Sequence, residues 1–186
     1  MPDASAADTL LADLPTWDLN DLYPSLDAPE LEADFEAAER EAKAFAAQYE
    51  GKLAGLSAEG LAEAIAAYEK MDERFWRIMS FAGLKHAENQ LDPQVGSFYQ
   101  NAQERVVTIS GHLLFFGLEL NKVDDATVER WLASPALAQY APWVRNVRIN
   151  RPHQLSDELE KFLHEQHVVG TAAWNRLFDE TMAGLR

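Results

Sequence analysis

The apolar residues in the first half of the chain recur at alternating spacings of three and four, the pattern of a helix that packs along one continuous seam. Residues 31–49 keep this spacing throughout, and Gly51 is placed to end the helix. A second run with the same rhythm covers residues 61–82, is interrupted once at Asp72, and has Ser57 in position to cap its start. The apolar positions are Leu31, Phe35, Ala38, Ala42, Phe45 and Tyr49 in the first run and Leu61, Ile65, Tyr68, Phe75, Met79 and Ala82 in the second.

Two such helices joined by about six residues are expected to fold back on each other as an antiparallel hairpin over residues 27–90. At the start of the first helix, Asp27 can cap the backbone, Pro29 suits the first turn, and Glu30 follows within the same turn. If this hairpin packed on little else, its aromatic residues would stay partly exposed and its tip at residues 52–56 would be mobile.

A third long helix is predicted from the Asp-Pro pair at residues 92–93, which is a helix start, and its apolar stripe runs over residues 95–120. The glycines inside the stripe indicate close packing against a neighbouring helix, because no glycine-rich phosphate-binding pattern is present. Shorter helices are expected to begin at Asp124 or Asp125 and near Ser134. The stripe consists of Val95, Phe98, Ala102, Val106, Ile109, Leu113, Phe116 and Leu120, and we place Leu113 and Phe116 in the core.

These patterns predict an all-α fold, with the long antiparallel hairpin followed by a bundle of helices over residues 91–186. No linker and no repeat of fixed period divides the chain, so residues 27–186 are expected to form one helical domain. Residues 1–26 are predicted to form an N-terminal strap. Trp17 and Leu22 would anchor this strap in the core, an interpretation we prefer to a ligand site.

The string His164-Glu165-Gln166-His167 nearly spells the zinc-peptidase motif H-E-x-x-H, but its second histidine comes one residue early. At about 100° per residue, the apolar arc of this helix lies opposite both histidines, which predicts that they form a solvated flank. An adventitious metal site from Glu160, His164 and His167 is the alternative. We therefore predict no metal ligand and no catalytic residue in this chain. The arc consists of Leu155, Leu159, Phe162, Leu163 and Val169.

One basic cluster stands out in an otherwise acidic chain, with Arg145, Arg148 and Arg151 following Trp143. It could bind a carboxylate of a substrate or of another domain. The alternative, which we favour, is that these arginines pair with the chain's own acids or stack on its tryptophans.

The net charge of −15 disfavours nucleic acid and anionic membranes as partners, because both are anionic. The sequence contains no cysteine, which excludes disulfides and thiol chemistry and suits a reducing cytosol. Residues 1–16 lack the features of a signal peptide, and the most apolar run, residues 113–118, is too short to span a bilayer. We expect a soluble cytoplasmic protein.

Three short motifs, taken in order and spacing, resemble the N-terminal region of oligoendopeptidase F. They are WDLNDLYP at residues 17–24, RPHQLS at residues 151–156 before an acidic helix start, and WNRLFDE at residues 174–180. Oligoendopeptidase F is a zinc metallopeptidase of the M3 (thimet oligopeptidase-like) family. The resemblance covers nearly the whole chain, from about Trp17 to its end.

This resemblance implies a parent protein that hydrolyses short peptides inside a deep groove walled by its N-terminal helices. The family's H-E-x-x-H helix and later glutamate ligand lie downstream of the matched region, so no zinc or catalytic residue is carried over and this segment alone is expected to be inactive. The implied partners are a downstream catalytic domain, with its zinc, and short peptide substrates. The substrate-binding residues stay unassigned. The alternative is a free-standing helical interaction or scaffold module without catalysis.

If the segment does wall a peptidase groove, part of its surface should be apolar and made for the downstream domain. We predict this face in the last third of the chain. A free-standing module need have no such face near its C-terminus. The candidates are Trp143, Val147, Trp174, Leu177 and Phe178, with Arg145 and Arg148 near the rim.

Overall fold

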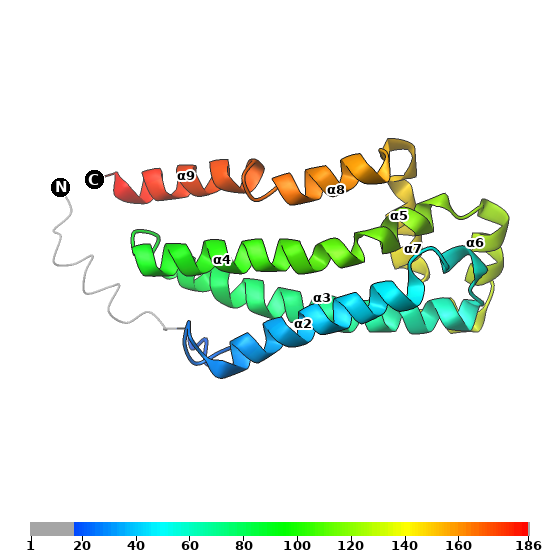
Figure 1. Ribbon diagram of the computed structural model, residues 1–186, viewed down its shortest axis with the longest axis horizontal. Coiled ribbons are helices and arrows are strands. Elements are labelled where there is room, and N and C mark those ends of the chain that lie inside the picture. Colours follow the sequence, from blue (N-terminus) through cyan, green and yellow to red (C-terminus); the bar gives the residue numbers. More distant parts are fainter. Residues whose placement is uncertain (1–16, 186) are drawn as a thin grey trace, which may run out of the picture.

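The computed structural model describes residues 17–185, and within that range the chain consists of helices, short 3₁₀ turns and connecting segments, with no strand. The predicted all-α class is confirmed, and Figure 1 shows long helices running side by side with shorter ones at one end. The α-helices are α2 (Pro29–Tyr49), α3 (Ala58–Glu88), α4 (Pro93–Ser110), α5 (Leu114–Lys122), α6 (Asp125–Leu132), α7 (Ala141–Ile149), α8 (Asp157–Gln166) and α9 (Thr171–Gly184). The 3₁₀ turns are η1 (Leu53–Gly55), η2 (Gly111–Leu113), η3 (Pro135–Leu137) and η4 (Arg151–His153).

Helices α2 and α3 form the predicted antiparallel hairpin (Figure 1). All six apolar positions predicted for α2 are its buried residues. Gly51 follows α2 with a φ of 75°, a left-handed conformation that glycine adopts without strain. Ser57 caps α3 by accepting a hydrogen bond from the Gly60 N–H at 3.1 Å. The predicted cap at Asp27 is wrong, because α2 begins after Ala28 and the Asp27 carboxylate accepts a hydrogen bond from the Ser25 hydroxyl instead.

The hairpin does not stand alone. Helix α4 packs along both α2 and α3, and the rings of Phe35 and Phe45 are buried. The hairpin tip is also held, because Leu53 is fully buried and Glu119 accepts a hydrogen bond from the Gly51 N–H at 2.6 Å. A loosely attached hairpin with a mobile tip is therefore not what the structure shows.

An aromatic cluster joins four helices at the centre of the bundle. Phe116 of α5 is fully buried and lies 5.1 Å from the ring of Phe45 and 5.3 Å from that of Tyr68. Trp143 of α7 also stacks on Phe116, with 5.8 Å between ring centroids, and lies 5.9 Å from Tyr68. Leu113 is also buried, so both residues that the sequence assigned to the core are confirmed there.

The start of the described chain is anchored by Tyr23 rather than by Trp17, which is 80% exposed and so contradicts the prediction. The Tyr23 ring is buried against Phe81, and its hydroxyl donates a hydrogen bond to Asp34 at 2.6 Å. Burial and this hydrogen bond raise the pKa of Tyr23. Leu22 is half-buried against the core, as predicted.

Residues 1–16 of the predicted strap lie outside the described residues, and the division at residues 26 and 27 stays a prediction. Within the described part of the chain, no helix is both long enough and apolar enough to cross a membrane.

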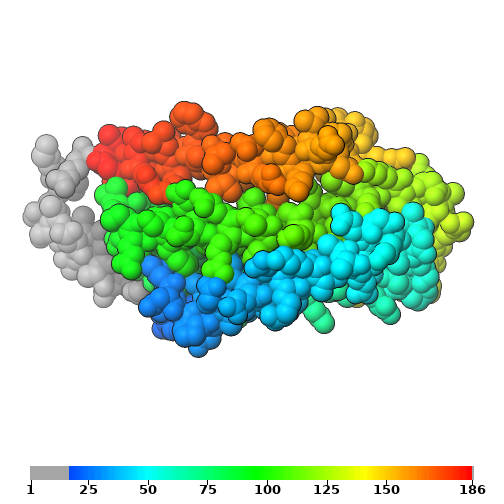
Figure 2. Space-filling view, in the orientation of Figure 1, coloured from blue at the N-terminus to red at the C-terminus, as the bar shows by residue number. Residues whose placement is uncertain are grey.

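Helices α8 and α9 lie nearly end to end along α4, on the side of α4 away from α2 (Figures 1 and 2). Neither helix contains a buried residue, unlike every other α-helix of the described chain. We call residues 155–185, which comprise α8, α9 and their connection, the arm.

Candidate functional site

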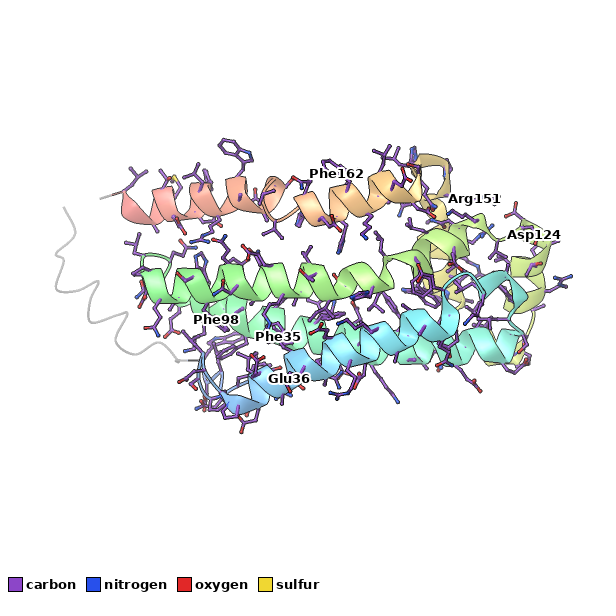
Figure 3. The ribbon with its side chains drawn as sticks, in the orientation of Figure 1. Phe35, Glu36, Phe98, Asp124, Arg151 and Phe162 are labelled. Atoms are coloured by element: carbon purple, nitrogen blue, oxygen red, sulfur yellow. The ribbon has the colours of Figure 1, made fainter. Side chains whose placement is uncertain are left out.

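The apolar residues of the arm are exposed. Phe162, which the helical phase placed toward the core, is 55% exposed and projects from the side of α8 away from α4 (Figure 3). Trp174 is 71% exposed. The predicted inward orientation of the apolar arc is therefore wrong, and the arc belongs to a larger exposed surface. This surface, the outer face, comprises Leu155, Leu159, Phe162, Leu163, Trp174, Phe178, Met182 and Leu185. Val169 and Leu177 are also exposed, but they border clefts between the arm and α4.

The polar side of α8 lies on the bundle instead. His164 Nε2 is 3.1 Å from the Ser110 hydroxyl oxygen and 3.1 Å from the Val107 carbonyl oxygen, both on α4. The prediction of a solvated flank is thus wrong for His164, although His167 is exposed as expected. Helical phase shows which residues share a face, but it does not show which of two opposite faces the rest of the protein covers.

The first turn of α8 is fixed by hydrogen bonds at its own start and by an ion pair with the end of α5. Ser156 caps the helix by accepting from the Leu159 N–H at 3.4 Å, and Glu160 accepts from the Leu155 N–H at 2.8 Å. Lys122, the last residue of α5, pairs with Asp157 at 2.6 Å. These contacts set the rotation of α8 about its own axis.

The polar side of α9 faces α3 and α4 in the same manner. Arg176 donates to Gln100 at 2.7 Å and to Glu180 at 2.6 Å. A side chain at Gly96 would come within 3.1 Å of the Arg176 guanidinium, so this glycine provides the space for the arginine. His86 of α3 is 5% exposed, and its Nε2 lies 4.0 Å from a carboxylate oxygen of Glu180 without a hydrogen-bond partner.

Clefts follow this polar seam between the arm and α4, and Figure 2 shows hollows along the line where the two meet. One cleft is bordered by Glu104 and Thr108 on α4 and by Lys161 and Glu165 on α8. The seam therefore combines specific polar contacts with apolar side chains, such as Val107, Val168 and Leu177, that border the clefts.

The three residues of the alternative metal site are not brought together. The Glu160 carboxylate accepts a backbone hydrogen bond and His164 turns toward α4, while His167 is exposed. Among residues 17–185 there is no group of three or more His, Cys, Asp or Glu that could hold a metal ion. The absence of catalytic and zinc residues from the chain stays a prediction.

Two of the three arginines of the basic cluster, Arg148 and Arg151, pair with the chain's own groups, in agreement with the interpretation we favoured, whereas Arg145 is exposed. Arg148 donates to the Leu120 carbonyl at 2.6 Å and the Val123 carbonyl at 3.0 Å, where α5 ends, and it also pairs with Asp125. Arg151 pairs with the same carboxylate at 2.6 Å. The hydrogen bond from Arg148, followed by the charge of Arg151, lowers the pKa of Asp125.

The face that the sequence predicted for a downstream domain is only partly correct. Trp143 and Val147 pack on the core, so they leave that face. Trp174, Leu177 and Phe178 are exposed, as predicted. Met182 and Leu185 were not predicted but also belong to the outer face; they follow Phe178 by four and seven residues, a helical spacing that could have revealed them.

Comparison with known proteins places the arm inside a known family region. A family model described as oligopeptidase F matches residues 119–186. The crystal structure of oligoendopeptidase-F from Enterococcus faecium superposes with a TM-score of 0.68 and 20% identity, over 75% of this chain and 27% of that chain. No curated protein matches the sequence significantly.

At this identity the superposition shows a shared fold, and the chain spans only about a quarter of the length of the matched structure. The family match lies in the last third of the chain and the fold match extends over most of it, so the two findings agree with the motifs seen in the sequence. Over most of its length the chain therefore shares the fold of the matched quarter of oligoendopeptidase-F, and its residues 119–186 match the family model described as oligopeptidase F.

Proposed function

We propose that the chain is the helical N-terminal part of an M3-type oligoendopeptidase, a cytoplasmic zinc peptidase that hydrolyses short peptides. The observation that carries this proposal is the family match over residues 119–186, because it includes the whole arm. The role of this part is structural. Its long helices form one wall of the peptide groove, and the arm faces the rest of the enzyme.

The zinc belongs to the downstream part of the parent protein in this proposal. A catalytic zinc needs three protein ligands and an open position for water. The nearest candidates here do not fit, because His164 is directed at the Val107 carbonyl and Glu160 at its own helix start. We assign no step of peptide hydrolysis to a residue of this chain.

The packing of the bundle supports the proposal that it forms a rigid wall of the groove. The α2, α3 and α4 helices are long and are held together by a continuous buried core, and their hairpin tip is fixed to α5 by Leu53 and Glu119. Such helices keep their shape when a peptide enters or leaves. The alternative, a free-standing interaction module, would also use the exposed arm but would need no zinc and no peptide.

The test is to express the chain together with the residues that follow Arg186 in the same reading frame and to assay cleavage of short fluorogenic peptides. We expect hydrolysis that a chelator abolishes and added zinc restores, while the 186-residue chain alone is inactive. A reading frame that closes at Arg186, or a longer protein without zinc-dependent hydrolysis, would favour the free-standing module. Zinc-dependent cleavage by the 186-residue chain itself would place catalysis in this part and contradict the proposal.

A further inference from the structure

We propose that the outer face of the arm is the surface on which the downstream part of the same polypeptide packs, through an apolar ridge flanked by basic residues. This inference rests on the proposed function and adds to it the surface used and the chemistry of its occupant.

The first argument is where the exposed apolar side chains lie. Ten of the fifteen large hydrophobic residues that are exposed in the described chain belong to the arm, which is less than a fifth of that chain. The eight of them that form the outer face expose on the order of 1,000 Å², whereas a monomer usually leaves apolar patches of only a few hundred Å². An area of this size is what one side of a stable protein interface buries.

The second argument is that the orientation of the arm is built in. Contacts at both ends and in the middle of the arm hold its polar side on the bundle: Lys122 with Asp157, His164 with α4, and Arg176 with Gln100. Rotating the arm to bury its apolar residues would break all three contacts. The outer face is therefore exposed because the opposite, polar side of the arm makes the specific contacts with the bundle.

The third argument decides between a second copy and the downstream chain. The whole chain has a net charge of −15, so two copies brought together would repel each other. The E. faecium structure, by contrast, has nearly three quarters of its length outside the matched region. A segment of the longer chain with lysines or arginines beside its apolar residues would complement both the hydrophobicity and the charge of the arm.

The experiment uses the absence of cysteine from the sequence. Single cysteines are introduced on the outer face by Leu159→Cys, Phe178→Cys and Met182→Cys, each at a position more than half exposed. The matched control is Trp76→Cys, at a position on α3 that is 67% exposed and lies outside the arm. Labelling by a bulky maleimide is followed for each site by peptide mass spectrometry, in the 186-residue chain and in the protein extended beyond Arg186.

We expect the arm sites to label at least tenfold more slowly in the extended protein than in the 186-residue chain, with no change at the control site. Equal labelling of the arm sites in both proteins would overturn the inference. So would slow labelling in the 186-residue chain that becomes faster on dilution, because that result assigns the face to a second copy. Three arm positions are used so that one poorly folded variant does not decide the outcome.

Peptide hydrolysis measured on the same extended protein separates this inference from the proposed function. Hydrolysis without protection of the arm would overturn the docking surface and leave the peptidase assignment standing. Protection of the arm without hydrolysis would overturn the peptidase assignment and leave the docking surface standing.

Discussion

The aromatic cluster provides the sharpest test of the bundle, through the substitution Phe116→Ala. Phe116 is fully buried, and its ring contacts Phe45 on α2, Tyr68 on α3 and Trp143 on α7. Truncating a buried phenylalanine to alanine costs about 3–5 kcal/mol, and each aromatic pair can add about 0.5–1.5 kcal/mol. These contributions overlap, so we expect a loss of about 4–5 kcal/mol in the free energy of unfolding.

Urea denaturation followed by circular dichroism measures this loss. With a slope of about 2 kcal/mol per molar urea, the midpoint should fall by about 2 M. The matched control is Trp76→Ala, which removes an exposed aromatic residue from α3 and should change the midpoint very little. A loss below about 1 kcal/mol for Phe116→Ala would refute the argument that this ring joins α5 to α2, α3 and α7.

Three further predictions concern polar contacts. Tyr23→Phe removes the hydrogen bond to Asp34 and should cost roughly 1.5–3 kcal/mol in urea denaturation; a neutral result would contradict the anchor at Tyr23. His164→Ala should cost about 0.5–1.5 kcal/mol while His167→Ala costs little, and calorimetric titration should find no submicromolar zinc site that the double substitution removes. Because its arginine partners lower the pKa of Asp125, its stabilising contribution is full above pH about 4 and is lost as the pH falls through the lowered pKa. Asp125→Asn should therefore reduce the thermal midpoint at pH 7, and this reduction should shrink as the pH falls through the lowered pKa; a reduction that stays constant with pH would contradict this ion pairing.

Periodicity predicted α2 well, because α2 is buried along one seam. In α3 it missed the buried Met71, Ile78 and Phe81, because α3 packs against both α2 and α4. In α2 the spacing of three and four selected the six residues that the structure buries, from Leu31 to Tyr49. The start at Pro29 was also within reach, since proline suits a first turn whatever caps the helix. The sequence did not show that Asp27 fails to cap the helix, because the Ser25 hydroxyl donates a hydrogen bond to its carboxylate instead.

The arm shows why the same method failed nearer the C-terminus. The residues that hold it on the bundle are far apart in sequence: His164 meets Ser110, and Arg176 meets Gln100. No local pattern encodes such contacts. Periodicity identified the apolar face of α8 correctly, yet the expectation that an apolar face is buried holds only when its partner is present.

The sequence did not show which aromatic residue anchors the start of the described chain. Trp17 is the larger residue, but Tyr23 combines a ring that fits against Phe81 with a hydroxyl that reaches Asp34. The interpretation of Arg148 was correct because a guanidinium group with little exposure needs acceptors, and Arg148 finds them at the end of α5 and at Asp125.

The most direct test of the account is complementation between two separate polypeptides, the 186-residue chain and the chain that follows it in the reading frame. The account predicts that neither piece cleaves short peptides alone and that mixing them restores zinc-dependent cleavage. It also predicts that Phe178→Asp weakens this restoration at least tenfold while Trp76→Asp does not. Two folded pieces that form no complex at micromolar concentration would contradict it.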